Sequence, residues 1–174
     1  MSGMFNYCIG VTALDVSGFD TSTVTNMSEM FKSCHSLTAL DVSVFDTSAV
    51  TDMGEMFGYC ESLAALDVSG FDTSAVTNMR WMFEGCSSLT ALDLSGFYTS
   101  AVTDMRWMFN NCAAMRTIYA SERFSTESVT NSFEMFSNCP ALVGGNGTPY
   151  DSTHTDKTYA RIDRPGTPGY FTAK

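Results

Sequence analysis

The chain has 174 residues, of which 44% are hydrophobic and 16% are charged. This composition suffices to bury a core and excludes a disordered tail. A formal net charge of −10 argues against a nucleic-acid partner and against docking on an anionic membrane, since both need clustered lysine and arginine. No apolar run approaches the length of a membrane span, so we expect no membrane insertion of this segment.

A 26-residue period runs through most of the chain. Met-Phe pairs, Leu-Asp pairs and cysteines each recur with this step, and the last repeat carries one inserted residue. The cysteines stand at Cys8, Cys34, Cys60, Cys86, Cys112 and Cys139. Self-similarity at a fixed period of about 20–50 residues is typical of solenoids, in which each repeat forms one coil. The period therefore predicts about five stacked coils over residues 1–142.

The second full repeat shows how one coil is expected to divide. Residues 38–43 alternate apolar and polar side chains, which predicts a short strand. Residues 44–51 are rich in turn-forming and β-branched residues. A short helix is then predicted from Asp52, because Asp52 and Glu55 fit an N-cap followed by an acidic residue at the third helical position. Its apolar residues recur at helical spacing and are interpreted as core: Met53, Met56, Phe57 and Cys60.

The six cysteines fall at equivalent points of different coils. Neighbouring coils about 5 Å apart would lie within disulfide range, but parallel side chains do not readily adopt the torsion of about 90° that a disulfide needs. A zinc site needs paired cysteine spacing, which the sequence lacks. We interpret the cysteines as small buried hydrophobic residues.

Two runs of the sequence resemble a known repeat family. LDVSGFDTSTVTNMSEMFKSC at residues 14–34 and LDLSGFYTSAVTDMRWMFNNC at residues 92–112 are similar to the 26-residue repeat of BspA-like leucine-rich-repeat bacterial surface proteins. The resemblance covers roughly residues 1–142. It implies an α/β leucine-rich-repeat solenoid whose coils each contain a short parallel strand, a turn and a short helix.

The resemblance also implies a location and a class of function. It points to a secreted or cell-surface protein that presents its repeats to a protein or extracellular-matrix ligand. It implies neither an enzymatic activity nor a cofactor, and it carries no set of functional residues. The chain begins in the middle of a repeat, so we expect a leader and an anchor to lie outside it.

The outward positions of the predicted strands form the first candidate site, the acidic stripe. It comprises Asp15, Asp41, Asp67 and Asp93, flanked by Ser17, Ser43, Ser69 and Ser95. Aspartates about 5 Å apart repel one another by up to ~1 kcal/mol per neighbour in water. Two interpretations remain open: a ladder that binds calcium or the lysines and arginines of a partner, and a solvated stripe that keeps the sheet soluble. No metal ligands are assigned, because calcium also needs backbone carbonyls and about 6–8 oxygens.

The second candidate site, the Arg-Trp patch, lies on the predicted helices. It comprises Arg80, Trp81, Arg106 and Trp107, at places where other repeats have Ser-Glu or Gly-Glu. Exposed tryptophan with arginine is the composition of interface hot spots. The alternative is that the indoles fill grooves along the helix row with arginine stacked on them.

The last repeat departs from the pattern, with Arg116 and Tyr119 as its unusual residues. Residues 143–174 are predicted to cap the last coil, with two short strands around a Pro-Gly turn in residues 159–171. The two histidines, His35 and His154, stand in no nucleophile motif, and no catalytic residue is assigned.

The sequence therefore leaves two alternative functions open. The first is a non-enzymatic binding or adhesion module that uses the acidic stripe, the Arg-Trp patch or both. The second is a structural spacer, with stabilisation by divalent cations as a variant of it. Self-association is a further expectation, because core residues at the N-terminal coil lack an upstream neighbour: Met4, Phe5, Leu14 and Val16.

Overall fold

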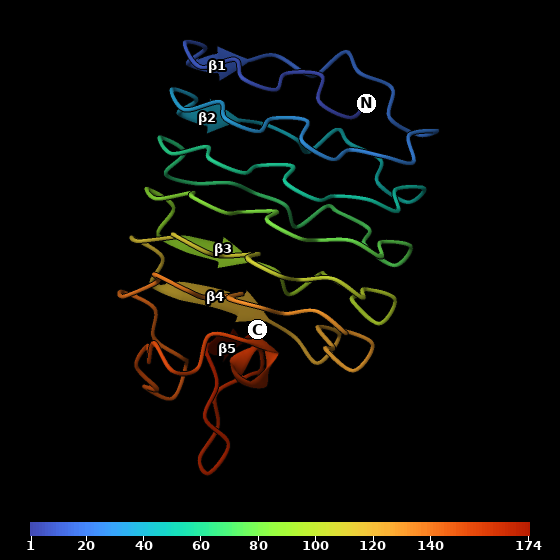
Figure 1. Cartoon of the computed structure of the whole chain (residues 1–174). Coiled ribbons are helices and arrows are strands. Elements are labelled where there is room, and N and C mark those ends of the chain that lie inside the picture. The colour runs from blue at the N-terminus through green and yellow to red at the C-terminus, as the bar shows by residue number, and fades with distance from the viewer.

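The computed structural model describes residues 1–174 as a stack of flat turns of chain with short parallel strands. The strands are β1 (Ala13–Leu14), β2 (Ala39–Leu40), β3 (Ala91–Asp93), β4 (Thr117–Ala120) and β5 (Phe171–Ala173), and a 3-10 helix, η1, spans Lys157–Tyr159. They form two small parallel sheets, β1-β2 and β3-β4-β5. Figure 1 shows the first repeat at one end of the stack and the C-terminal segment at the other. This arrangement is compatible with a repeat solenoid.

The strands are shorter than the sequence predicted. Of the predicted strand 38–43, only Ala39–Leu40 pairs, with Ala13–Leu14 of the preceding repeat. The equivalent residues of the third repeat, 64–69, belong to no strand. The two sheets are therefore separated at the third repeat, and the stack does not depend on a continuous strand ladder.

The predicted helices are wrong, because the structure contains no α-helix. Residues 52–60 instead form consecutive tight turns, with Glu55 at φ 60° and Tyr59 at φ 59°. Their alternate amides bond to the next repeat: Met53 N to Asn78 O at 3.0 Å, Glu55 N to Arg80 O at 2.8 Å, Phe57 N to Met82 O at 3.0 Å and Tyr59 N to Glu84 O at 2.6 Å. An amide that donates to the next repeat is not available for the helical bond to the carbonyl four residues earlier.

We call residues 26–34, 52–60, 78–86, 104–112 and 131–139 the turn segments. The prediction of their buried face is confirmed even though the helix is not. Met53, Met56, Phe57 and Cys60 are all fully buried. Tight turns that reverse direction every few residues thus bring the same positions inward as a helix would. The apparent N-cap is explained by Asp52, whose Oδ1 accepts the Gly54 amide at 2.9 Å in a local turn.

A stack of phenylalanine rings runs along the core. Consecutive rings lie 5.4–5.8 Å apart between centroids, with interplanar angles of 6–10°. The stacked residues are Phe5, Phe31, Phe57, Phe83, Phe109 and Phe136. Offset stacking at this spacing is favourable beyond simple burial, so each repeat packs on the next through the same contact.

The cysteines belong to this core and form no disulfide. All six are free thiols, and five of them are buried. The Cys60 thiol donates to the Phe31 carbonyl of the preceding repeat at 3.2 Å, and Cys86 does the same to Phe57. Burial raises the pKa of the Cys34 thiol to about 11 and that of Cys86 to about 12. These thiols are therefore protonated packing groups at neutral pH.

Residues 143–174 lie against the last repeat. β5 pairs in parallel with β4. The Phe136 amide donates to Thr155 O at 2.9 Å, just as the equivalent Phe109 amide donates to Met135 O of the next turn segment. The predicted Pro-Gly turn is present as a short antiparallel bridge between Arg164 and Thr167. The predicted pair of strands within residues 159–171 is not formed; only Phe171, the last residue of that range, belongs to a strand, β5, which joins the parallel sheet.

Asp163 organises this segment. Its carboxylate accepts the amides of Asn146 at 2.8 Å and Thr148 at 3.0 Å, the Thr148 hydroxyl at 2.7 Å and the Gly169 amide at 3.3 Å. Burial acts to raise the pKa of Asp163, but the hydrogen bonds from Thr148, Asn146 and Gly169 outweigh it and lower the pKa. Gly144 passes so close that a Cβ there would lie 2.1 Å from Gly169 O.

We predict that Asp163→Asn removes part of the acid sensitivity of the fold. The lowered pKa means that Asp163 contributes its full stability above the unfolded value of about 3.9 and loses it as the pH falls through the folded pKa. Urea unfolding at several pH values should show a smaller acid-dependent loss in the variant than in the parent chain. Glu127→Gln, at an exposed position, is the control. Equal acid dependence in the Asp163→Asn and Glu127→Gln variants would contradict this role.

Candidate functional site

Each carboxylate of the acidic stripe holds its own backbone in a turn. The amide of the serine two residues later donates to Oδ1 in all four cases. The distances are 3.0 Å for Ser17 to Asp15, and 2.9 Å for Ser43 to Asp41, Ser69 to Asp67 and Ser95 to Asp93. Such Asx turns are a local alternative to regular secondary structure. The repeated Asp-x-Ser pattern is thus explained first by the path of the chain.

These hydrogen bonds also keep the stripe ionised. The side-chain and backbone hydrogen bonds from Ser17 lower the pKa of Asp15, and those from Ser43 lower the pKa of Asp41. Ser69 has the same effect on the pKa of Asp67. The stripe therefore remains negatively charged to a lower pH than free aspartate would.

One oxygen of each carboxylate remains for other partners. At Asp93, Oδ1 accepts the Ser95 amide while Oδ2 accepts the Lys174 ammonium. Lys174 comes from the end of the chain and lies 5.6 Å from the centroid of the Tyr119 ring. The Oδ2 atoms of the other three aspartates accept no hydrogen bond within the chain, and these residues are exposed: Asp15, Asp41 and Asp67.

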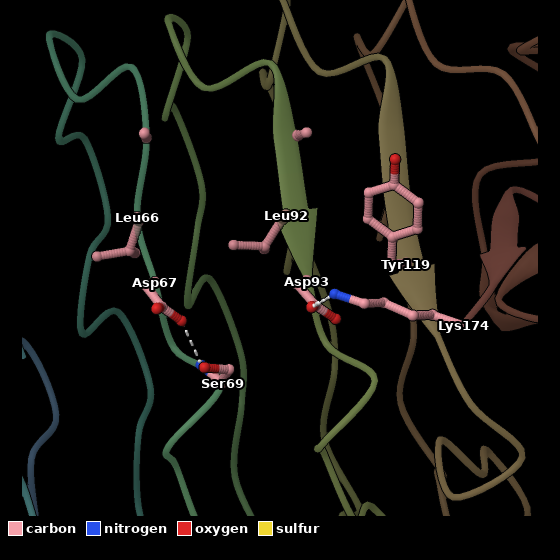
Figure 2. A pocket seen from close by; sticks show the side chains of 9 residues that line it. Leu66, Asp67, Ser69, Leu92, Asp93, Tyr119 and Lys174 are labelled. Atoms are coloured by element: carbon pink, nitrogen blue, oxygen red, sulfur yellow. Dashed lines mark hydrogen bonds and ion pairs between the residues drawn. The ribbon is translucent and has the colours of Figure 1, made fainter. Parts of the chain in front are cut away.

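An open hollow of about 570 Å³ lies at the end of the stripe. Figure 2 shows Asp67 and Asp93 on neighbouring repeats, with Lys174 reaching across β4 to Asp93. Apolar side chains complete the lining, so the hollow combines hydrophobic walls with carboxylates. The lining residues are Ala65, Leu66, Asp67, Ser69, Ala91, Leu92, Asp93, Tyr119 and Lys174.

Sequence analysis found only part of this hollow. Asp67 and Asp93 were predicted, and Tyr119 was singled out as a departure from the repeat. The contribution of Lys174 was missed, because its contact with Asp93 joins residues 81 apart in the sequence. The only signal for it was the predicted capping role of residues 143–174, which does not specify where the last side chain points.

The Arg-Trp patch is brought together as a stacked ladder. The indoles of Trp81 and Trp107 lie 4.9 Å apart between centroids at an interplanar angle of 3°. The Arg80 guanidinium lies over Trp81 at 4.8 Å, and Arg106 lies 5.5 Å from the Trp81 ring and 5.9 Å from the Trp107 ring. The two indoles therefore cover each other's faces, and arginine covers them further. This geometry agrees with the alternative in which the indoles pack along the stack with arginine stacked on them.

The last repeat extends the ladder with Phe133 and Glu134, which were not singled out from the sequence. The Phe133 ring meets Trp107 edge-on at 5.4 Å and is 58% exposed. Trp107 Nε1 donates to the Glu134 carboxylate at 2.9 Å. Because the indole faces are occupied, only ring edges and Phe133 remain for a partner here. The substitution of Phe133 at a position that holds Arg106 in the previous repeat was the available signal.

The conformation of the tryptophans belongs to the scaffold. Trp81 has φ 53° and Trp107 has φ 54°, and the residues at the same position of other repeats have φ 57° at Glu29 and φ 60° at Glu55. A left-handed backbone is unfavourable for a bulky residue. It recurs here because the turn segment requires it, so it is no sign of a site of its own.

The remaining reactive side chains are dispersed. His35 Nδ1 lies 3.2 Å from Glu61 Oε1, and His154 Nδ1 lies 3.2 Å from Asp151 Oδ2. The two pairs are in different parts of the stack. No group of three or more His, Cys, Asp or Glu side chains is placed to hold a metal ion. The structure also has no helix long and apolar enough to cross a membrane.

Comparison with known protein families gives a match over most of the chain. The model of a family described as Mycoplasma protein of unknown function, DUF285, matches residues 1–117 and again residues 38–147. No curated protein and no solved structure matches the chain.

We predict that Asp67→Ala is more destabilising than Asp67→Asn. The asparagine side chain keeps an oxygen that can accept the Ser69 amide, whereas alanine leaves this turn without an acceptor at a cost of about 0.5–1.5 kcal/mol. Urea unfolding of the two variants measures the difference. Equal stability of the alanine and asparagine variants would show that the Asx turn does not matter to the stack.

We predict that the two indoles are energetically coupled. A double-mutant cycle with Trp81→Ala and Trp107→Ala should give a coupling free energy of roughly 0.5–1.5 kcal/mol, as expected for a stacked aromatic pair. Thermal or urea unfolding supplies the four stabilities. Strict additivity of the two substitutions would mean that the rings are not stacked in solution.

Proposed function

The chain belongs to the DUF285 family just described, and from this premise we propose that it is a non-enzymatic repeat module that binds basic segments of another protein. The finer assignment, a BspA-like leucine-rich-repeat solenoid, is part of this proposal. So is a location at a bacterial cell surface or in a secreted protein. The strand face is the proposed binding surface, with the acidic stripe as its charged element.

The contact between Lys174 and Asp93 carries the proposal. A lysine from a distant part of the chain already lies on the stripe, where it uses the carboxylate oxygen that the Asx turn leaves open. Asp15, Asp41 and Asp67 repeat the same geometry, and no cation of the chain is hydrogen-bonded to them. A lysine or arginine of a partner could therefore make the contact that Lys174 makes at Asp93.

The hollow adds an apolar element to this charge. Ala65, Ala91 and Leu92 line it beside Asp67 and Asp93. A basic side chain buries its methylene groups against such a surface while its charged end reaches a carboxylate. Within the chain, Lys174 reaches Asp93 with its ammonium 5.6 Å from the centroid of the Tyr119 ring. The expected ligand is an extended segment rich in lysine or arginine.

The rest of the chain supports a binding module better than an enzyme. The Asp-x-Ser patterns recur from one repeat to the next over residues 15–95, and they serve the turns. An active site would break the repeat with an unusual residue. The break at Trp81 and Trp107 is occupied by mutual stacking, and it supplies no nucleophile or base.

A structural spacer remains the second candidate function. The observation that favours it is the use of every Asp-x-Ser pair in an Asx turn, which accounts for the repeated aspartates without a ligand. The two functions differ in what they predict for Lys174. A spacer gives Lys174→Ala no effect on binding, whereas a lysine-binding stripe gains a free carboxylate at Asp93.

We predict that surface plasmon resonance will detect binding of the chain to an immobilised oligolysine peptide and to an extracellular-matrix extract. Replacing Asp41 and Asp67 by asparagine should weaken binding roughly two- to thirtyfold, since each exposed ion pair contributes about 0.2–1 kcal/mol. Lys174→Ala should strengthen binding. Binding should also weaken with added salt.

A charge-matched control comes from the second aspartate row of the repeats. Asp46 and Asp72 form the same Asx turns with Ser48 and Ser74 and are equally exposed. They lie outside the acidic stripe, and neither lines the hollow, which Asp67 does. Replacing this pair by asparagine removes the same charge and should change binding less than replacing Asp41 and Asp67. Absence of binding, or an equal effect of both double variants, would refute the proposed surface.

A further inference from the structure

A second open hollow, of about 480 Å³, lies where the last two turn segments meet the chain that follows them. Its volume falls within the range of about 300–1,000 Å³ that is usual for small-ligand sites. It shares no residue with the hollow at the acidic stripe, and none of its lining residues is charged. A neutral polar ligand therefore fits it better than a basic one. The lining residues are Asn111, Ala113, Asn138, Pro140, Tyr150 and Ser152.

Two asparagines of this hollow form a hydrogen-bonded pair. Asn138 Nδ2 donates to Asn111 Oδ1 at 2.9 Å, and both residues are exposed. A side-chain amide has two N–H donors and one carbonyl acceptor. The Asn111 Nδ2 group and the Asn138 Oδ1 atom make no hydrogen bond within the chain. The pair therefore offers a ligand one donor group and one acceptor side by side.

The paired amides occur at this end of the stack alone. Asn111 and Asn138 have φ 60° and 59°, and the same position of earlier repeats is also left-handed, with Ser33 at φ 58° and Gly85 at φ 68°. Asparagine tolerates this backbone better than most residues do. Serine and glycine serve the turn as well, however, so the backbone does not require two asparagines in succession.

Tyr150 supplies an aromatic ring that is held in place. Its hydroxyl accepts the Asn138 amide at 3.1 Å, in the role that the Ser137 carbonyl has for the Asn111 amide at 2.9 Å. Its ring centroid also lies 6.1 Å from that of Tyr170. A sugar ring has an apolar C–H face and a polar rim, so an aromatic ring beside amides is a suitable platform for it.

A third hollow, of about 400 Å³, adjoins this one and shares Ser152 with it. Phe133 lines it and is 58% exposed. The carboxylates in its lining are already used, since Glu134 accepts Trp107 Nε1 and Asp156 accepts the amide and hydroxyl of Thr158. Hydroxyl groups supply most of the remaining lining: Ser132, Ser137, Ser152, Thr153 and Thr155. The second hollow thus repeats the combination of an aromatic ring with neutral polar groups.

We propose that the two adjoining hollows form one groove, which binds a neutral oligosaccharide that contains N-acetylhexosamine. The acetamido group of such a sugar has one N–H donor and one carbonyl acceptor, which complement Asn138 Oδ1 and Asn111 Nδ2. Its methyl group meets Ala113 and Pro140, and its sugar ring lies on Tyr150. The next sugar units continue past the shared serine into the third hollow. The groove uses no residue of the acidic stripe, so this proposal stands or falls separately from binding of a basic partner.

Isothermal titration calorimetry with two trisaccharides tests the proposal. Triacetylchitotriose and cellotriose have the same sugar backbone and linkage, and only the first carries acetamido groups. The chain should bind triacetylchitotriose about tenfold more tightly, the effect of one hydrogen-bonded group. A neutral oligoserine peptide, whose amides also carry a donor and an acceptor, should bind more weakly than triacetylchitotriose. Binding of neither trisaccharide, equal binding of both, or tighter binding of the peptide would overturn the proposal.

The asparagine pair is tested by replacing both residues with glycine. Asn111→Gly with Asn138→Gly keeps the left-handed backbone, as Gly85 does at the same position, and should weaken binding of triacetylchitotriose about tenfold. Tyr7→Gly is the matched control, because Tyr7 has the same place in the first repeat, φ 60° and 66% exposure. It should leave binding unchanged. Equal affinities of the double variant and the Tyr7→Gly variant would refute the role of the pair.

An NMR titration of the unaltered chain needs no variant. Triacetylchitotriose should shift the side-chain amide signals of Asn111 and Asn138. The side-chain amide of Asn26, which belongs to the second repeat and lines none of the hollows, should not shift. Shifts that leave the signals of Asn111 and Asn138 unchanged would place the sugar elsewhere and overturn the proposal.

Discussion

The structure depends on one row of hydrogen bonds, in which every second amide of a turn segment donates to the next repeat. Met27, Glu29, Phe31 and Ser33 bond in this way to the second repeat at 2.7–2.9 Å. The row resembles a parallel strand ladder, although the chain between its members turns back at Glu29 and Ser33 with positive φ. It spaces the repeats evenly, and the phenylalanine stack and the cysteine thiols follow that spacing. The short strands β1 to β4 contribute less to joining the repeats, since the third repeat has no strand.

The repeat period and the core could be predicted from sequence because both rest on side-chain identity at fixed spacing. Met53, Met56, Phe57 and Cys60 are fully buried, as predicted. The helix could not be excluded in this way. Apolar residues at i, i+3, i+4 and i+7 also arise from consecutive tight turns, and the sequence does not state whether an amide bonds to its own segment or to the next repeat. The left-handed backbone at Glu29 and Glu55 could not be predicted either, because glutamate does not favour positive φ.

The candidate sites could likewise be predicted only in part from the sequence. The alternation of residues 38–43 placed the aspartates outward, and the shared position in the repeat brought Trp81 and Trp107 together as expected. Which of their atoms are free depends on partners that the repeat pattern does not show. Asp67 gives one oxygen to Ser69 and keeps the other, while the tryptophan faces are used by each other and by Arg80. The acidic stripe is therefore the surface that we propose for binding, whereas the Arg-Trp patch is a packing ladder with an exposed end at Phe133.

The repeats are joined by amides of the turn segments and not by packed helices. Scalar coupling across hydrogen bonds, measured by NMR on deuterated protein, identifies the carbonyl that each amide bonds. We predict a coupling between the Phe57 amide and the Met82 carbonyl, and another between the Glu55 amide and the Arg80 carbonyl. A coupling from the Phe57 amide to the Met53 carbonyl, the partner that an α-helix would use, would contradict it.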